Sequence, residues 1–174
     1  LPAKVTGAAY VHDVLPRGVL HARTLRQPNP GARLVALDEA AIRRAATGEL
    51  QIVREANFVA FVSPVESVAQ AAAVAAPAYA RWDGLRQLTA AHQEAAWLKG
   101  QLAEDRRLGA APRTTAPKNP VQITVSRPYI AHASMGPSCA LALFKDEHLT
   151  VWSHGQGMAP LQKNLAPAPG LPVS

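Results

Sequence analysis

Few side chains of this sequence could bind a metal ion. Its six histidines are His12, His21, His92, His132, His148 and His154. No two of them have the close helical spacing of a metal-binding face, so most are interpreted as surface or core histidines. The single cysteine, Cys139, excludes an internal disulfide and any zinc or iron–sulfur site built from several cysteines of this chain. We therefore predict no metal site made of protein side chains.

Nucleophilic catalysis is not indicated either. Cys139 falls in an apolar strand pattern, with no helix terminus or neighbouring cation to activate a thiol, and is interpreted as a small buried hydrophobic residue. Ser134 lacks the glycine two positions earlier that a nucleophile elbow requires. We therefore predict no catalytic residue within the chain.

Two segments have compositions that suit ligand binding. In one of them, Gln156 lies between Gly155 and Gly157, directly after an expected strand. Glycines allow a ligand to approach the backbone closely, and a strand end fixes the position of the amide. The other segment, 127–140, combines polar, glycine and proline residues ahead of an apolar strand. Spacing alone favours a simple turn with a solvated amide over a ligand-binding glutamine, and both interpretations stay open.

The elements that would position these residues are short. Alternation and turn signals predict strands at 10–14, 19–26, 33–37, 50–53, 58–62 and 78–82. Asp38 is placed to cap a helix at 39–46, and a capping box at 63–66, with Pro64 in the first helical position, predicts a helix that ends before Pro77. A further helix is expected at 89–102. The 15 prolines argue against long uninterrupted helices.

The second part of the chain follows a segment without periodicity. Residues 108–120 are rich in proline and are interpreted as a linker. Strict alternation predicts a strand at 121–125, and two apolar runs around the polar loop 145–148 predict a hairpin. A helix is expected at 158–165. The predicted fold class is α+β, and residues 121–174 are expected to expose a hydrophobic face.

Charge and hydropathy exclude several classes of protein. The 18 Lys and Arg outnumber the 12 Asp and Glu, but the excess is spread along the chain and no nucleic-acid motif accompanies it. We therefore predict no nucleic-acid partner. The longest apolar stretch, 57–80, contains Glu66 and two prolines and does not predict a membrane span. The first residues contain neither an initiator Met nor a signal peptide, and we expect the chain to be an interior piece of a longer protein.

Several ordered blocks of the sequence resemble one enzyme family. The blocks of the first half are 4–7, Tyr10, Asp13, 20–23, 30–34 and 58–76. They resemble the a/b hammerhead domain of molybdenum hydroxylases, the xanthine dehydrogenase and aldehyde oxidase family. Residues 127–140 and 149–157 resemble the start of the molybdopterin-binding region. The form with Gly136 followed by Pro137 is closest to large subunits of the bacterial nicotinate dehydrogenase type, whereas other branches tend to carry glutamate at that position.

The resemblance implies an organisation and a cofactor. Residues 1–107 would be the hammerhead domain, 108–120 the linker and 121–174 the truncated start of the molybdopterin-binding domain. The family hydroxylates an N-heteroaromatic or aldehyde carbon with oxygen from water, at a molybdenum held by a pterin, here the molybdopterin cytosine dinucleotide. Its partners are a small subunit with [2Fe–2S] clusters and often a cytochrome c, besides the small-molecule substrate.

The resemblance also assigns roles to individual residues. Gln156 matches the family glutamine that hydrogen-bonds the cofactor, and Gly155 and Gly157 would let the cofactor approach the backbone. The substrate-pocket residues that it implies are His132, Ser134 and Gly136. The sequence departs from the family at Gly155, where serine or threonine is more common, and at Pro167 and Pro169, which interrupt a usually continuous helix.

The family's general base, a glutamate, comes far beyond Ser174, so the resemblance predicts that this chain alone is inactive. The competing hypothesis is a non-catalytic binding or scaffold module that keeps the fold. The compartment is not determined by the sequence, and the bacterial cytoplasm and the periplasmic side of the inner membrane both stay open.

Overall fold

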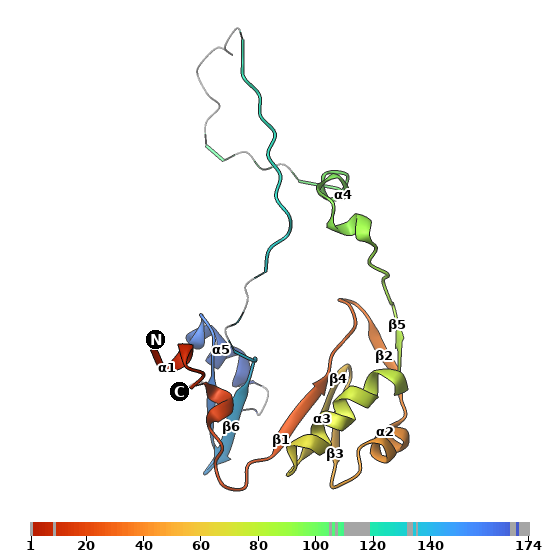
Figure 1. Cartoon of the computed structure of the whole chain (residues 1–174), viewed down its shortest axis with the longest axis vertical. Coiled ribbons are helices and arrows are strands. Elements are labelled where there is room, and N and C mark those ends of the chain that lie inside the picture. The colour runs from red at the N-terminus through yellow and green to blue at the C-terminus, as the bar shows by residue number, and fades with distance from the viewer. Residues whose placement is uncertain are drawn as a thin grey trace.

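The fold mixes short helices with small antiparallel sheets. The computed structural model describes residues 2–8, 10–104, 106, 108–109, 119–131, 134, 136–167 and 170. Figure 1 shows two groups of elements. One is formed by the elements from His21 to Asp83, and the other by the elements before Val14 together with those from Ala140 to Leu165. The α+β class is confirmed at this level, whereas the division into named domains stays a prediction.

The first group contains two sheets. Strands β1 (His21–Leu25), β4 (Phe58–Ser63) and β3 (Gln51–Glu55) form an antiparallel sheet in the order β1-β4-β3. Strand β2 (Arg33–Leu37) pairs antiparallel with β5 (Ala80–Asp83) in a second sheet. Four of these strands overlap the predicted ranges closely, and β2 has the predicted bounds.

Two helices belong to this group, of which α3 (Glu66–Ala75) packs on the first sheet and α2 (Glu39–Ala45) packs on α3. Helix α2 begins after Asp38, whose carboxylate accepts a hydrogen bond from the backbone N–H of Ala41 at 2.9 Å. This confirms the predicted cap. Helix α3 packs against β1 and β4 and continues into the 3₁₀ turn η2 (Ala76–Tyr79) (Figure 1). The α-helix therefore ends before Pro77, as its position predicts.

The core lies between this sheet and these helices. Its largest fully buried hydrophobic side chains are Phe61 and Val59 of β4 and Ile42 of α2. Around them the helices contribute mainly alanine, as at Ala69 and Ala72 of α3, which are fully buried. Alanine offers little apolar area, whereas burial of each of the three larger side chains contributes about 1.5–3 kcal/mol. Leu25 and Leu34 are buried in the same core.

The start of α3 differs from the prediction. Ser63 is not the first residue of a capping box, because it is the last residue of β4, pairs with His21 and is buried. Its hydroxyl accepts a hydrogen bond from the backbone N–H of Val65 at 3.0 Å, and the helix begins at Glu66. The Glu66 carboxylate instead contacts the guanidinium of Arg23 on β1, so it is used to join helix and sheet.

The second group is built around a hairpin. Strand β6 (Ala140–Lys145) pairs antiparallel with β7 (His148–Ser153), which confirms the predicted hairpin. The turn is shorter than predicted, because Lys145 and His148 are already paired and only two residues remain, with φ angles of 52° and 59°. Helix α5 (Met158–Leu165) follows with the predicted bounds. Cys139 precedes β6 and is half-buried, so its interpretation as a buried residue is wrong.

The beginning of the chain belongs beside this hairpin. A short helix α1 (Pro2–Val5) is followed by the 3₁₀ turn η1 (Val11–Asp13), which contacts β6 (Figure 1). The strand predicted at 10–14 is wrong. The Asp13 carboxylate accepts a hydrogen bond from the backbone N–H of Tyr10 at 2.9 Å, which closes a tight turn instead of leaving the N–H for a neighbouring strand.

A long connecting segment joins β5 to β6 and so links the two groups. The helix predicted at 89–102 is divided into η3 (Ala90–Gln93) and α4 (Ala95–Lys99). Of the predicted linker, residues 110–118 lie outside the described residues. Residues 121–125 are extended but pair with no strand among the described residues, so the strand predicted there is wrong.

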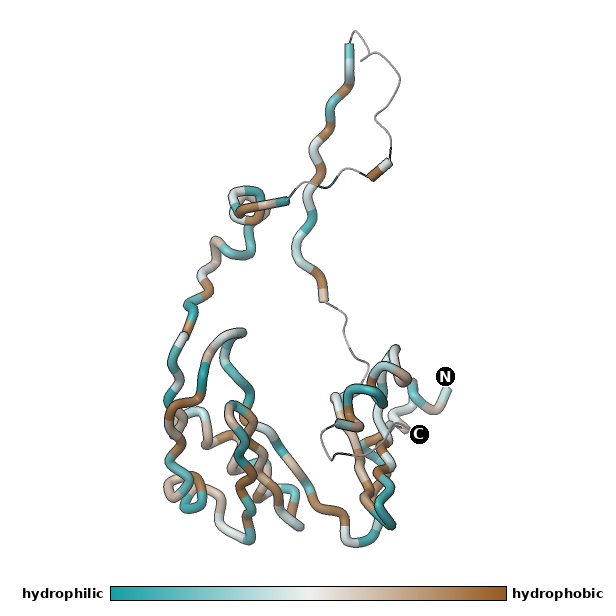
Figure 2. Tube along the Cα trace, turned by 180° about the vertical axis from the view of Figure 1, so that it is seen from behind, coloured by the Kyte–Doolittle hydropathy of each residue, from teal (hydrophilic) through white to brown (hydrophobic). Residues whose placement is uncertain are grey.

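Several apolar side chains of this half of the chain are exposed. Figure 2 shows apolar and polar residues alternating along the extended segment 119–131. Its exposed large hydrophobic residues are Val121, Ile123, Val125, Tyr129 and Ile130. Leu143, Phe144 and Trp152 of the hairpin are exposed as well, so apolar surface is exposed as expected. It does not form a single face, because Leu143 and Trp152 lie on one side of the hairpin and Phe144 on the other. No described helix is both long enough and apolar enough to cross a membrane.

Candidate functional site

The predicted cofactor residues follow the end of β7. Strand β7 ends at Ser153, and residues 154–157 lead into α5, whose first turn is closed by a hydrogen bond from Leu161 N–H to the carbonyl of Gly157 at 3.1 Å. Gln156 is exposed in this connection, and its amide makes no hydrogen bond within the described part of the chain. Both N–H donors and the carbonyl acceptor of the amide are therefore available to a ligand.

The two glycines beside Gln156 are not required by the backbone. Gly157 has φ of −133°, and neither Gly155 nor Gly157 adopts the left-handed conformation that favours glycine. A Cβ at Gly157 would lie 3.7 Å from Pro160, an ordinary contact, and one at Gly155 would meet only the flexible end of Met158 at 3.0 Å. The fold alone therefore does not explain these glycines, and the backbone on both sides of the Gln156 amide is open.

The predicted substrate-pocket residues are placed only in part. Ser134 is exposed and Gly136 is half-buried, whereas His132 lies outside the described residues. An open pocket of about 500 Å³ lies beside Gly136, and Gln156 is not among its described lining residues. The lining residues are Lys4, Val5, Gly7, Tyr10, His12, Gly136 and Pro137. The described structure thus joins Gly136 to the beginning of the chain and not to Gln156.

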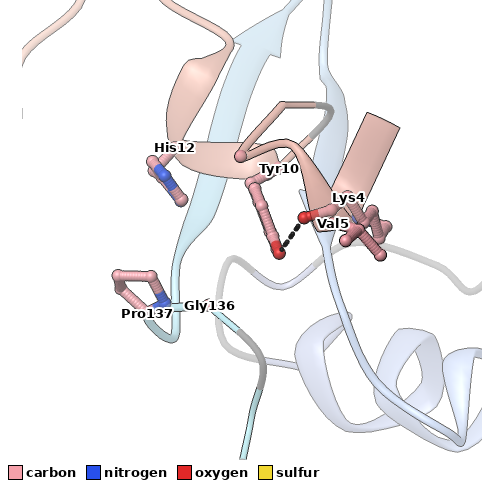
Figure 3. Close-up of a pocket in the computed structure, with 7 residues that line it drawn as sticks. Lys4, Val5, Tyr10, His12, Gly136 and Pro137 are labelled. Atoms are coloured by element: carbon pink, nitrogen blue, oxygen red, sulfur yellow. Dashed lines mark hydrogen bonds between the residues drawn. The ribbon is translucent and has the colours of Figure 1, made fainter. Parts of the chain in front are cut away.

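Tyr10 is the centre of this pocket (Figure 3). Its hydroxyl donates a hydrogen bond to the Lys4 carbonyl at 2.9 Å, and its ring stacks on His12 with the centroids 5.3 Å apart. The Lys4 ammonium lies 4.4 Å from the centre of the same ring, within the range of a cation–π interaction. A Cβ on Gly136 would be 2.7 Å from the Tyr10 ring.

These aromatic residues have no predicted role. Tyr10 and Asp13 occur in the blocks that carry the resemblance, but nothing in their local sequence indicates a contact with residues that come more than a hundred positions later. The signal that could have found them is the tight local turn formed by Tyr10 and Asp13, which leaves the tyrosine ring projecting from a fixed backbone.

Acidic, histidine and cysteine side chains do not gather in the described structure. No group of three or more of them that could hold a metal ion occurs among the described residues. His12 lies 3.4 Å from the Asp13 carboxylate, and both side chains are exposed, so their ion pair, if the imidazole is protonated, contributes little to stability.

Comparison with known proteins gives a distant relative. The chain is 29% identical over 186 residues to a nicotinate dehydrogenase subunit from Pseudomonas putida, and the aligned region covers 95% of this chain. The chain spans about 15% of the length of that protein. No family model and no solved structure matches the chain. The sequence is therefore distantly similar to part of an oxidoreductase subunit.

Proposed function

We propose that this chain forms part of the large subunit of a molybdenum hydroxylase of the nicotinate dehydrogenase type. The observation that carries the proposal is the similarity to the Pseudomonas putida nicotinate dehydrogenase along 95% of the chain. Residues 1–107 would be the hammerhead domain and residues 121–174 the start of the molybdopterin-binding domain. Strands β1 to β5 lie within the first of these ranges and the hairpin of β6 and β7 lies within the second, although η1 of the first range contacts β6.

Gln156 is the residue through which this chain would hold the cofactor. The bound molybdenum–pterin group, as its cytosine dinucleotide, would supply the redox centre for hydroxylation of an N-heteroaromatic or aldehyde carbon with oxygen from water. The exposed Gln156 amide would donate a hydrogen bond to the cofactor and fix its orientation without adding charge. Gly155 and Gly157 leave the backbone on both sides of it open.

The chain would contribute to substrate binding as well. Ser134 and Gly136 lie ahead of β6, and their segment would form one wall of the substrate pocket. Electrons would leave through a small subunit with [2Fe–2S] clusters, with a cytochrome c as a further acceptor. Since the described residues include no group assigned as general base, catalysis would require more of the subunit than this chain.

The proposal is tested on the protein purified from its natural host through a tag on this chain. We expect molybdenum in stoichiometric amount and reduction of an artificial electron acceptor that depends on an N-heteroaromatic substrate. Gln156→Ala should lower the molybdenum content and the activity without disturbing the fold, because the amide makes no hydrogen bond to any of the described residues. The matched control is Gln87→Ala, which removes the same exposed amide from the segment between β5 and η3.

A second variant separates cofactor binding from folding. Gly157→Ala should leave the melting temperature unchanged, because the added Cβ meets nothing closer than 3.7 Å, yet should reduce molybdenum content if the cofactor lies against this backbone. Protein without molybdenum and without acceptor reduction would refute the proposal and favour the non-catalytic binding module. Equal loading of Gln156→Ala and Gln87→Ala would refute the role of Gln156.

A further inference from the structure

The ring of Tyr10 and the backbone of Gly136 occupy adjoining space. We propose that Tyr10 is the positioning residue of the predicted substrate-pocket segment, holding Gly136 and the start of β6 against the beginning of the chain. The proposal rests on the proposed function only for the role of that segment. The contact between Tyr10 and Gly136 is independent of any cofactor.

Position 136 requires glycine because a side chain has no room there, and not because of the backbone conformation. Gly136 does not have a positive φ, so an L-residue could adopt its backbone. A Cβ there would nevertheless lie 2.7 Å and 2.8 Å from two ring carbons of Tyr10, whereas carbon atoms in favourable contact are about 3.5–4.0 Å apart. The glycine is therefore needed because the tyrosine ring fills the volume of a side chain at this position.

The ring cannot easily move away. Its hydroxyl is bonded to the Lys4 carbonyl at 2.9 Å, and the backbone N–H of Tyr10 is bonded to the Asp13 carboxylate at 2.9 Å. His12 stacks on the ring with 17° between the planes, and the Lys4 ammonium lies 4.4 Å from its centre. Figure 3 shows Gly136 and Pro137 opposite this arrangement. The ring is thus fixed by residues of its own segment and presents a rigid surface to Gly136.

The consequence concerns the residues ahead of β6. The extended segment 119–131 pairs with no strand among the described residues, so it cannot itself fix Ser134 and Gly136. The turn η1 contacts β6, and the Tyr10 ring contacts the backbone of Gly136, four residues before that strand begins. Tyr10 therefore decides where the predicted pocket segment enters the hairpin.

The test uses isotope-labelled protein of the full chain and NMR spectroscopy. Protons on Gly136 Cα lie close enough to the tyrosine ring to experience a ring-current shift. We expect this shift to be abolished by Tyr10→Leu and retained by Tyr10→Phe, which keeps the ring and loses only the bond to Lys4. Loss of stability alone would not produce this pattern, because both variants remove the hydroxyl.

Hydrogen exchange measures the coupling between the two residues. Tyr10→Leu and Gly136→Ala should each make the amides of β6 and β7 exchange roughly three- to tenfold faster, as expected for loss of one packed aromatic contact. Amides of β4 should be unaffected. Because the clash exists only with the tyrosine, Gly136→Ala should add nothing when combined with Tyr10→Leu. Gly100→Ala is the control, since its Cβ would meet only ordinary contacts at 3.5 Å.

Two results would overturn the inference. One is a Gly136 proton shift that is the same in the unchanged chain and in Tyr10→Leu. The other is a pair of effects on hairpin exchange that simply add in the double variant. Either result would leave the molybdenum assay of Gln156 untouched, and absence of molybdenum would leave the ring-current shift untouched, so the two proposals fail separately.

Discussion

Replacing Asn57 by alanine should strongly destabilise the first element group. Asn57 lies in the turn between β3 and β4, and its side chain bridges to β2 of the other sheet. The side-chain carbonyl of Asn57 accepts a hydrogen bond from the backbone N–H of Leu34 at 2.8 Å. Its side-chain NH₂ donates a hydrogen bond to the backbone carbonyl of Ala32 at 2.9 Å. Both Leu34 and Ala32 are buried, so water cannot readily replace the lost partner.

The size of this destabilisation depends on which hydrogen bonds Leu34 and Ala32 keep in the variant. The Ala32 carbonyl also accepts from the Gln27 side chain at 2.9 Å and remains satisfied, whereas the side-chain carbonyl of Asn57 is the partner found for Leu34 N–H. An orphaned buried donor costs about 1–3 kcal/mol and one lost net hydrogen bond about 0.5–1.5 kcal/mol. We therefore expect Asn57→Ala to lower the free energy of unfolding by about 2–4 kcal/mol.

Urea unfolding followed by tryptophan fluorescence measures this loss, because Trp82, one of the three tryptophans, packs against the core of the same group. Gln27→Ala should lower the free energy of unfolding by less, since the Ala32 carbonyl still accepts the hydrogen bond from Asn57 in that variant. The double variant should cost more than the sum by about 1 kcal/mol, because Ala32 then loses both partners. Asn119→Ala removes an exposed asparagine elsewhere and should change stability by less than about 0.5 kcal/mol. A loss for Asn57→Ala no greater than that of the Asn119 control, or strict additivity with Gln27→Ala, would refute the reasoning.

Three further changes act on local backbone geometry. Ala56 has φ of 50°, so Ala56→Gly should raise the free energy of unfolding by about 1 kcal/mol in urea titrations, and a decrease would contradict this. Asp38→Ala should lower the melting temperature through a loss of about 1 kcal/mol, while Asp38→Asn should keep most of the cap; equal losses would argue against capping. Changing Asp146 to Asn together with Glu147 to Gly should slow hydrogen exchange of the β6 and β7 amides, because both positions have positive φ and Asn-Gly is the favoured sequence for such a turn. Faster exchange in this variant would contradict the prediction.

The elements predicted best are those whose signals lie within a few residues. Strand β2 and helix α5 have the predicted bounds, and the Asp38 cap is made by the predicted side chain. A cap, a turn or a short alternating run is decided by neighbours in the sequence. No knowledge of tertiary contacts is needed to find such elements.

Two of the wrong predictions depend on residues far away in the sequence. Ser63 has the spacing of a helix cap, but its pairing with His21 makes it a strand residue. Residues 121–125 alternate as a strand should, yet alternation describes one strand only and does not supply the partner that pairing requires.

The candidate site shows the same limit. Exposure of Gln156 after a strand end is predictable, because the strand and the glycines are adjacent to it in sequence. The contact of Tyr10 with Gly136 is not predictable in this way, since it joins residues about 125 positions apart.

That separation also shapes how the chain folds. The pair β3–β4 and the pair β6–β7 each close through a two-residue connection, and both hairpins can form early. Bringing Tyr10 to Gly136 closes a loop of about 125 residues, at an entropic cost of about 4 kcal/mol for a flexible chain. During synthesis the tyrosine emerges long before its glycine exists. Docking of residues 2–13 should therefore be the last and slowest folding step, and the first contact to be lost when the protein unfolds.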